Sequence, residues 1–412
     1  MPSFSTSLSG LNANSLALSV IANNLANLNT IAYKGMTPIF RDLFYQQVGS
    51  SGSGNPVQVG VGAMMSSIAS PFTQGSIDST GVPTDVALQG DGFFLVDIGG
   101  MRSYTRAGNF TIDTAGRLVN DEGGFVMGYP AVNGVISPSQ TLAPLSIATG
   151  QMSPPQATTS VRLAMNLDAS ATVGATFSTP VVVYDSLGTS HVLTYTFTKS
   201  AANSWTYQIT IPAADVGGSG APVSISNGTL TFDGAGQLTA PAADVNGITI
   251  ASLADGANNL SFTWNLYDAN GTPTVTQVAG PSATSSTHQD GFSSGTLFNF
   301  SVTGDGIIHG VLSNGQTLAL GQIAVATFPN PQGLMRNGAN SYLASLSSGL
   351  PNVGAPGTGA RATIMGGAVE RSNVDIAREF AQLIMAQRGY QANARAITTA
   401  DEVTQEAINL KR

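Results

Sequence analysis

The segment from Ser372 to the C-terminus constrains the fold most strongly, because apolar residues recur along it at every seventh position. The repeat runs through Ile376, Leu383, Tyr390 and Ile397, with Phe380, Ala394 and Ile408 on a neighbouring line. Ser372 and Asp375 form a helix start signal. A helix from there to about Leu410 would be about 55 Å long. A helix of this length with one apolar seam requires a partner helix.

The N-terminus carries a second helical pattern that contains no charged residue before Lys34. Its apolar positions are Phe4, Leu8, Leu11, Leu18, Ala22 and Leu25, and its polar face is made of Asn12, Ser15, Ser19, Asn23 and Asn27. Such a polar face can be buried without desolvating ions. The segment lacks the basic region of a signal peptide and is too polar for a membrane span. A core helix of a globular domain is the simpler alternative, but two such helices favour pairing, within or between subunits.

Several motifs resemble those of bacterial flagellar rod and hook proteins. They are ANNLANLNTIAYKG at 22–35, DVALQGDGFF at 85–94, YTRAGNF at 104–110, SNVD at 372–375 and QRGYQAN at 387–393. SNGQTLALGQIA at 313–324 and FPNPQGL at 328–334 resemble the hook members of the family in particular. The similarity is dense over about 1–130 and 290–412 and keeps the same order along the chain.

Composition limits the classes of function. Charged residues make up 9% of the chain, against about 25% in an ordinary soluble domain. Low charge weakens repulsion between copies, which suits a polymer. The net charge of −8 argues against a nucleic-acid-binding surface. The absence of cysteine removes disulfides, thiolate catalysis and cysteine-ligated metals.

The chain is expected to be mainly β, with two all-β domains in a nested arrangement and a helical domain formed by the paired terminal helices. Strands are predicted from strict alternation, as in 193–197 and 205–211, and from Asp-Gly and Gly-Gly turns. The predicted parts are a helical domain (1–33 and 370–412), a connector (34–69 and 347–369), a first β-domain (70–144 and 286–346) and an inserted outer β-domain (145–285).

No catalytic, cofactor or metal site is predicted. His191, His288 and His309 lie far apart in sequence and have no ligand partner at metal-binding spacing, so structural roles are favoured. There is no G-x-S-x-G nucleophile motif and no phosphate-binding glycine loop. We therefore expect a protein that is not an enzyme.

The resemblance implies a structural subunit of the flagellar hook that assembles with itself into a curved, flexible tube. The tube would join rod to filament and transmit motor torque. The residues expected to carry self-assembly are Phe4, Leu8, Leu11, Leu18, Asn23, Leu25, Asn27, Ile376, Phe380, Leu383, Tyr390 and Ile397. Arg388 and Arg395 lie on one line of the C-terminal helix. That line is either a solvated face or, as the resemblance implies, a surface facing the central channel.

The resemblance also implies distal rod, hook–filament junction and hook cap proteins as partners. Export would use the flagellar type III apparatus without a cleaved signal peptide, giving an extracellular location without membrane insertion. A distal rod subunit is the nearest alternative, although rod proteins of the family lack a large second β-domain. A secreted β-sandwich adhesin is an alternative of another class, with Trp205, Tyr207 and Trp264 as its aromatic surface. It leaves the terminal helices unexplained.

Overall fold

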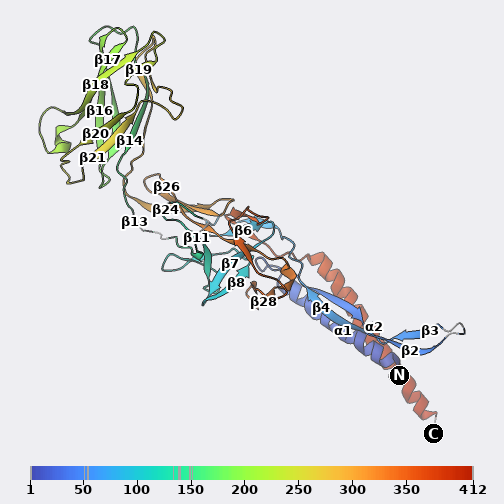
Figure 1. The fold of residues 1–412 in the computed structure, drawn as a ribbon. Coiled ribbons are helices and arrows are strands. Elements are labelled where there is room, and N and C mark those ends of the chain that lie inside the picture. The colour runs from blue at the N-terminus through green and yellow to red at the C-terminus, as the bar shows by residue number, and fades with distance from the viewer. Residues whose placement is uncertain are drawn as a thin grey trace. The chain divides into compact units, whose positions relative to one another are not determined.

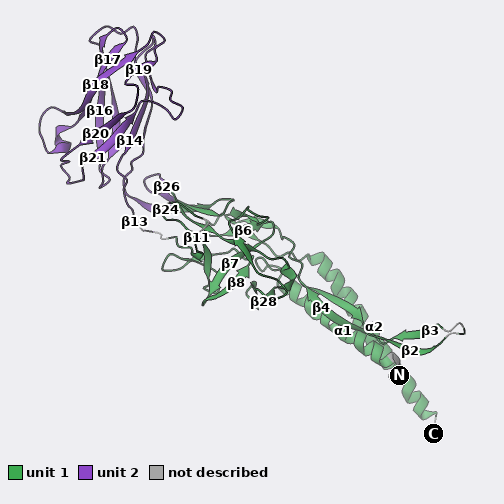
Figure 2. Ribbon diagram, in the orientation of Figure 1, with its two compact units in different colours: residues 1–148, 299–310, 317–412 green, residues 149–298, 311–316 purple. Residues whose placement is uncertain are grey.

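The computed structural model has two compact units (Figure 2). It describes residues 2–50, 52, 55–132, 134–137, 141–147, 150 and 152–410. Unit 1 comprises residues 1–148, 299–310 and 317–412, and unit 2 comprises residues 149–298 and 311–316. The chain is mainly β, with one helix near each terminus and the two helices in contact, which confirms the predicted fold class (Figure 1).

The two helices belong to unit 1. Helix α1 spans Pro2–Ala26 and helix α2 spans Ile376–Asn409. The carboxylate of Asp375 caps α2 by accepting hydrogen bonds from the backbone N–H groups of Ala377 and Arg378. The helix therefore begins after Asp375 rather than at Ser372, because Asn373 is held in contacts outside the helix. Neither helix, as far as it is described, is long and apolar enough to cross a membrane.

The described part of unit 1 contains four two-stranded sheets besides its main sheet. Strand β1 (Thr37–Asp42) pairs with β4 (Ala63–Ala69), β2 (Tyr45–Ser50) with β3 (Pro56–Gly60), β5 (Ile77–Ser79) with β32 (Ala368–Glu370), and β6 (Val86–Gln89) with β31 (Thr363–Gly366). All four pairs are antiparallel. The last two pairs join segments from opposite ends of the chain, so the path out and the path back lie side by side.

The main sheet of unit 1 includes the strand order β24-β25-β26-β11-β7-β8-β29-β28. These strands are β7 (Phe93–Ile98), β8 (Met101–Thr105), β11 (Phe125–Pro130), β24 (Gly295–Val302), β25 (Ile307–Leu312), β26 (Thr317–Ile323), β28 (Met335–Gly338) and β29 (Ser341–Leu343). Short strands β9 (Thr111–Ile112), β10 (Leu118–Val119), β12 (Ala143–Pro144), β27 (Val325–Thr327) and β30 (Asn352–Gly354) pair beside it. Edge-to-face contacts join Phe93 to Phe72, Phe328 and Tyr342, so aromatic packing forms its core.

Unit 2 contains two five-stranded sheets that share one apolar core. One sheet has β14 (Ser160–Asn166), β20 (Val245–Ile250), β21 (Leu260–Asn265), β22 (Val275–Thr276) and β23 (Ala283–Gln289). The other has β15 (Thr176–Tyr184), β16 (Ser190–Ala201), β17 (Ser204–Ile211), β18 (Val223–Phe232) and β19 (Leu238–Ala240). Trp205, Tyr207 and Trp264 are all buried in this core. They cannot form the exposed aromatic surface that the adhesin alternative requires.

The predicted domain boundaries remain a prediction. The outer domain was placed at 145–285, whereas unit 2 runs from 149 to 298 with a short return at 311–316. The predicted helical and connector segments lie within unit 1. Of the predicted first β-domain, 70–144, 299–310 and 317–346 lie in unit 1, whereas 286–298 and 311–316 belong to unit 2.

Candidate functional site

Helices α1 and α2 pack against each other through small residues. Ala17 and Ile21 of α1 form a buried cluster with Ala386 of α2. A Cβ added at Gly389 would lie 2.8 Å from Oδ1 of Asn14, so α1 approaches α2 closely there. The small residues therefore set the distance between the two helices.

Two matching Gly-x-x-x-Asn motifs, one on each helix, lie next to this cluster on the same side of it. Asn14 donates through Nδ2 to the carbonyl of Gly10 at 2.8 Å, and Asn393 donates to the carbonyl of Gly389 at 2.9 Å. Each asparagine lies over the glycine of the other helix. Since position 10 meets 393 while 14 meets 389, the helices are antiparallel (Figure 1). We call these four residues the Gly–Asn clasp.

The clasp predicts the effect of Gly389→Leu. The added side chain would enter the space of Asn14 and force the helices apart, at a cost of about 1–3 kcal/mol of unfolding free energy. Without that clash, leucine should stabilise a helix relative to glycine by roughly 1 kcal/mol. Thermal unfolding followed by helical circular dichroism measures the difference. Ala392→Leu, at an exposed position of α2, is the control and should not destabilise the chain. Equal stability of the two variants would contradict the close approach.

The residues predicted for self-assembly lie beside the clasp rather than at its centre. Leu11, Leu18, Leu25, Leu383 and Ile397 are half-buried. Phe4, Leu8, Ile376, Phe380 and Tyr390 are exposed, with exposed fractions between 37% and 51%. Leu18, Leu25 and Leu383 pack against the small-residue cluster. A single copy therefore leaves much of the apolar surface of both helices uncovered.

Of the polar residues predicted on the helices, the two asparagines of α1 form hydrogen bonds within the chain and the two arginines of α2 are exposed. Asn23 donates through Nδ2 to the Tyr33 hydroxyl at 3.1 Å, and Asn27 donates to the carbonyl of Asn23 at 2.9 Å. Both asparagines therefore order the end of α1. Arg388 and Arg395 are exposed on α2, and the assignment of these two side chains to a channel surface stays a prediction.

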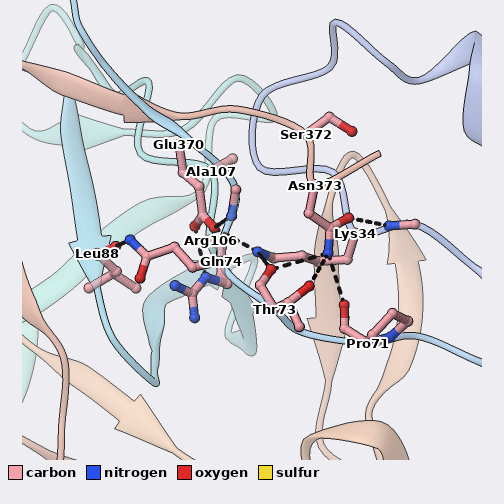
Figure 3. A network of polar contacts seen from close by, with 12 residues as sticks. Lys34, Pro71, Thr73, Gln74, Leu88, Arg106, Ala107, Glu370, Ser372 and Asn373 are labelled. Carbon is pink, nitrogen blue, oxygen red and sulfur yellow. Dashed lines mark hydrogen bonds and ion pairs between the residues drawn. The ribbon is translucent and has the colours of Figure 1, made fainter. Parts of the chain in front are cut away.

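A buried ionic cluster lies where the chain leaves α1 and returns to α2 (Figure 3). Glu370 of β32 accepts from Nζ of Lys34 at 2.6 Å and from Nε of Arg106 at 2.8 Å. It also accepts from the backbone N–H of Gly75 at 2.8 Å. All three charged side chains are at most 2% exposed. We call Lys34, Arg106 and Glu370 the junction triad.

The remaining donors of the triad bind backbone carbonyls. Lys34 donates to the carbonyl of Thr73 at 2.8 Å, and Arg106 donates to those of Gly90 and Gly92 at 2.9 and 3.1 Å. Three segments that are far apart in sequence are thus fastened to one carboxylate. The Asp-Gly turn at 90–92 therefore has a second role, because its carbonyl oxygens accept hydrogen bonds from the buried guanidinium of Arg106.

The triad carries one more positive than negative charge, which affects both pKa values. Burial, with the Arg106 charge adding to it, lowers the pKa of Lys34 to about 8 against the attraction of Glu370. Burial alone would raise the pKa of Glu370, but the neighbouring charges of Arg106 and Lys34 hold it below its ordinary value. Glu370 is therefore an ionised carboxylate at neutral pH.

Two asparagines hold the backbone on either side of the triad. Asn24, which is 1% exposed, donates to the carbonyl of Met36 at 2.8 Å and accepts from its N–H at 2.9 Å. Asn373 accepts from the N–H of Gly35 at 2.8 Å and donates to the carbonyls of Pro71 and Thr73. The motifs at 22–35 and 372–375 therefore bind each other directly. The sequence identified both motifs by their resemblance to the family but predicted no role for Asn24 or Asn373.

Sequence reasoning also missed Glu370. A signal for it is present in the sequence: it is a charged residue that ends an apolar strand in a chain with few charges, two positions before the motif at 372–375. Its partners Lys34 and Arg106 lie 336 and 264 positions away, so no local spacing could pair them.

Unit 2 has its own buried polar group around His191. Its Nε2 lies 3.1 Å from Asp185 Oδ2 and its Nδ1 lies 3.1 Å from Asp215 Oδ2. Burial would lower the pKa of His191, but the bonds to the two carboxylates raise it above its ordinary value. For Asp185 the effects have the opposite sign. Burial would raise the pKa of this carboxyl, but hydrogen bonds involving Asp255, His191 and two backbone N–H groups lower it to about 2.

The fold also brings Asp255 close, so that Asp185, His191 and Asp255 offer ligand atoms within 4.8 Å of one another. Sequence spacing did not indicate this grouping, because folding brings the three side chains together. The absence of a metal site stays a prediction. Both imidazole nitrogens already bond to carboxylates, which favours an imidazolium and a structural role.

This geometry predicts a pH-dependent stability of unit 2. Because the folded pKa of His191 is raised, its contribution is complete below pH 6.5 and is lost as the pH rises through the folded value. Both tryptophans lie in unit 2, so tryptophan fluorescence during denaturation reports this unit. His191→Gln should abolish the alkaline loss, whereas His288→Gln, at an exposed position of β23, should keep it. A loss that persists in His191→Gln would contradict the assignment.

Four protein-family models match the chain in order. They are the flagella basal body rod protein (residues 4–34), the flagellar hook protein FlgE/F/G D1 domain (87–166), the flagellar basal body protein FlaE D2 domain (156–292) and the flagellar basal body rod FlgEFG protein C-terminal region (365–410). The first and last contain the α1 and α2 motifs that meet at the clasp.

Curated relatives match over the whole length. The flagellar hook protein FlgE of Treponema pallidum is 35% identical over 463 residues, covering 100% of both chains. That of Salmonella typhimurium is 34% identical over 429 residues, covering 99% of this chain and all of the relative. The crystal structure of Helicobacter pylori flagellar hook protein FlgE2 has a TM-score of 0.55 at 15% identity, covering 71% of this chain and 99% of that one. At this identity the structural similarity supports the fold alone.

Proposed function

Since this chain belongs to the flagellar hook protein FlgE family, we propose that it is a structural subunit of the bacterial flagellar hook. Many copies would assemble into a curved, flexible tube that joins rod to filament and transmits motor torque. The observation that carries the proposal is the full-length match, at 34–35% identity, to hook proteins. The match of residues 156–292 to the D2 domain model favours the hook over the rod alternative.

The surface of the terminal helices supports assembly with further copies of the same chain. The apolar residues that a single copy leaves exposed include Phe4 and Leu8 on α1 and Ile376 and Phe380 on α2. An apolar line of this length is expected to be covered in the working state. Copies of the same helices are the natural cover in a polymer, because the polar side chains of α1 are uncharged and need no desolvation of ions.

The junction triad suits a subunit that must transmit force. Torque applied to one copy would pass between its helices and the β-part of unit 1. Lys34 and Arg106 join these parts by binding the buried carboxylate of Glu370. Bending would then be taken up between copies while each junction stays intact.

The remaining parts of the proposal follow from family membership. The partners would be the distal rod, hook–filament junction and hook cap proteins, and export would use the flagellar type III apparatus to an extracellular site. We assign no catalytic role, because Glu370 is already bonded to Lys34, Arg106 and a backbone N–H group. His191 is likewise bonded to two carboxylates.

Electron microscopy of basal bodies from a strain that lacks this chain tests the proposal. Rods that end without hook or filament are expected, and the intact chain supplied in trans should restore both. Intact hooks in the deletion strain would overturn the proposal. Shortened rods would instead assign the chain to the rod.

A further inference from the structure

Helix α2 carries a line of four charged residues, two basic ones followed by two acidic ones. Arg395 follows Arg388 by seven positions, Glu402 follows Arg395 by seven, and Glu406 follows Glu402 by four. With the periodicity of an α-helix, all four lie within about 40° of one line along the helix. All four side chains are exposed. We call Arg388, Arg395, Glu402 and Glu406 the charged stripe.

The charged stripe has no partner of opposite charge in the helical part of one copy. None of its members takes part in an ion pair among the described residues. Helix α1, which packs beside α2, contains no charged side chain. Lys411 and Arg412 lie outside the described residues, and neither is three or four positions from a glutamate, the spacing at which side chains meet on a helix.

The acidic half of the charged stripe is unfavourable in an isolated helix. Glu402 and Glu406 are four positions apart, so their carboxylates repel each other. Both lie near the C-terminal end of α2, where the helix dipole favours cations, and the described last turn contains no basic residue. This end of α2 also extends past the first residues of α1 (Figure 1), since position 10 of α1 lies beside position 393. Proteins break such local rules mainly at functional sites, so a cationic partner is expected here.

Large apolar residues lie beside the charged stripe. The side chains of Ile384, Met385 and Val403 are all exposed. Each lies within about 60° of Arg388 around the helix axis. A helix face that combines charge with uncovered apolar side chains is typical of a contact surface. This combination favours a protein partner over the channel or solvated face considered for Arg388 and Arg395.

The order of the charges makes the stripe complementary to a displaced copy of itself. Glu402 follows Arg388 by fourteen positions, and Glu406 follows Arg395 by eleven. If a parallel second helix is displaced by 12–13 residues, or about 19 Å, each arginine of one copy comes level with a glutamate of the other to within about 2 Å. The two arginines then face one neighbour and the two glutamates face another, so the same contact can repeat along a polymer.

We propose that the charged stripe of one copy binds the charged stripe of a second copy that is displaced along the helix axis. Arg388 and Arg395 of one copy meet Glu402 and Glu406 of the next. The inference rests on the proposed function as a self-assembling subunit and adds to it the register between neighbouring α2 helices. Complementary charges mainly fix the register and reject wrong pairings. Because the two halves of the contact differ, it does not close on itself, which is the heterologous geometry of a helical tube.

Charge reversal in the full-length chain tests this contact. Arg388→Glu with Arg395→Glu makes the stripe wholly acidic, and Glu402→Arg with Glu406→Arg makes it wholly basic. Each double variant should reduce polymer yield by about tenfold or more, because like charges then meet in every copy. The variant with all four reversals restores the complementarity and should assemble like the unchanged chain. Arginine and glutamate are both good helix formers, so circular dichroism of every monomer should equal that of the unchanged chain.

Arg378→Glu is the matched control for the charge reversals. Arg378 is an exposed arginine of α2 that lies about 80° around the helix from Arg388. The substitution changes the net charge as Arg395→Glu does, but it leaves the stripe intact. Arg378→Glu should therefore assemble normally, whereas Arg395→Glu should lower the yield.

Cysteine cross-linking measures the register, because the chain contains no native cysteine. Polymers are assembled from a mixture of full-length Arg395→Cys and Glu406→Cys variants and treated with a short bis-maleimide. Covalent dimers are expected from the mixture and not from polymers of either variant alone. A mixture of Arg395→Cys with Leu187→Cys, an exposed residue of unit 2, is the control and should give none.

The outcomes separate this contact from the proposed function. Unchanged yield from either double variant would overturn the contact and place the charged stripe in water, as the channel or solvated alternative requires. Normal polymers that give no cross-link, or a fourfold variant that fails to recover, would also overturn it. In each of these cases the proposed function stands, because the unchanged chain still assembles. If the unchanged chain forms no polymer, the proposed function fails and this contact fails with it.

Discussion

Glu370→Gln should lower the unfolding free energy of unit 1 by about 3–5 kcal/mol. The substitution removes the carboxylate charge but keeps nearly the same shape, so Lys34 and Arg106 remain buried without a counter-charge. Both helices belong to unit 1. Chemical denaturation followed by helical circular dichroism therefore measures the loss, and tryptophan fluorescence should show unit 2 unchanged.

The adjacent residue offers a matched control. Arg371 forms an ion pair with Asp78 at 2.7 Å, but both side chains are nearly half exposed. Arg371→Gln should therefore cost at most about 1 kcal/mol, as surface ion pairs do. Similar losses for the two variants would contradict the view that burial makes the triad strong.

The surplus positive charge of the triad predicts different stability losses for substitution of Lys34 and of Glu370. Lys34→Met removes the surplus and leaves the balanced pair of Arg106 and Glu370, so it should cost less than Glu370→Gln. Because the pKa of Glu370 is lowered, its contribution is complete above pH 4.5 and is lost as the pH falls through the folded value. The Glu370→Gln variant should lack this acid-sensitive component.

The sequence could predict those features that local patterns encode. The seven-residue repeats and the cap at Asp375 are local, and they predicted both helices and their pairing. The strict alternation around Trp205 similarly predicted buried strands in unit 2. In each case the periodicity of the burial follows directly from helix or strand geometry.

The contact surface between the helices could not be predicted in the same way. Large apolar residues such as Leu18 and Leu383 dominate a sequence pattern, whereas the closest approach uses Gly10, Ala17 and Gly389. Small residues carry little weight in a hydrophobic repeat, yet they allow two backbones to come close. The junction triad could not be predicted for another reason: Glu370 lies 336 and 264 positions from Lys34 and Arg106, so only the tertiary fold brings the three residues together.

Leu8→Asp should abolish hook assembly while the monomer stays folded. Leu8 is 44% exposed in one copy and lies outside the buried cluster of Ala17, Ile21 and Ala386, so a single chain tolerates a charge there. In the proposed polymer, this apolar line becomes covered by neighbouring helices. A buried, unpaired carboxylate then costs several kcal/mol in each copy, and identical copies repeat that cost along the tube.

Sedimentation of polymers and complementation of a hook-deficient strain measure the assembly, and circular dichroism of the monomer measures the fold. Leu8→Met, which keeps an apolar side chain of similar volume, should assemble normally. Normal hooks built from Leu8→Asp would show that this face of α1 stays in contact with water in the polymer. The assembly surface would then have to lie on the β-domains, and the exposed apolar line of α1 would need another explanation.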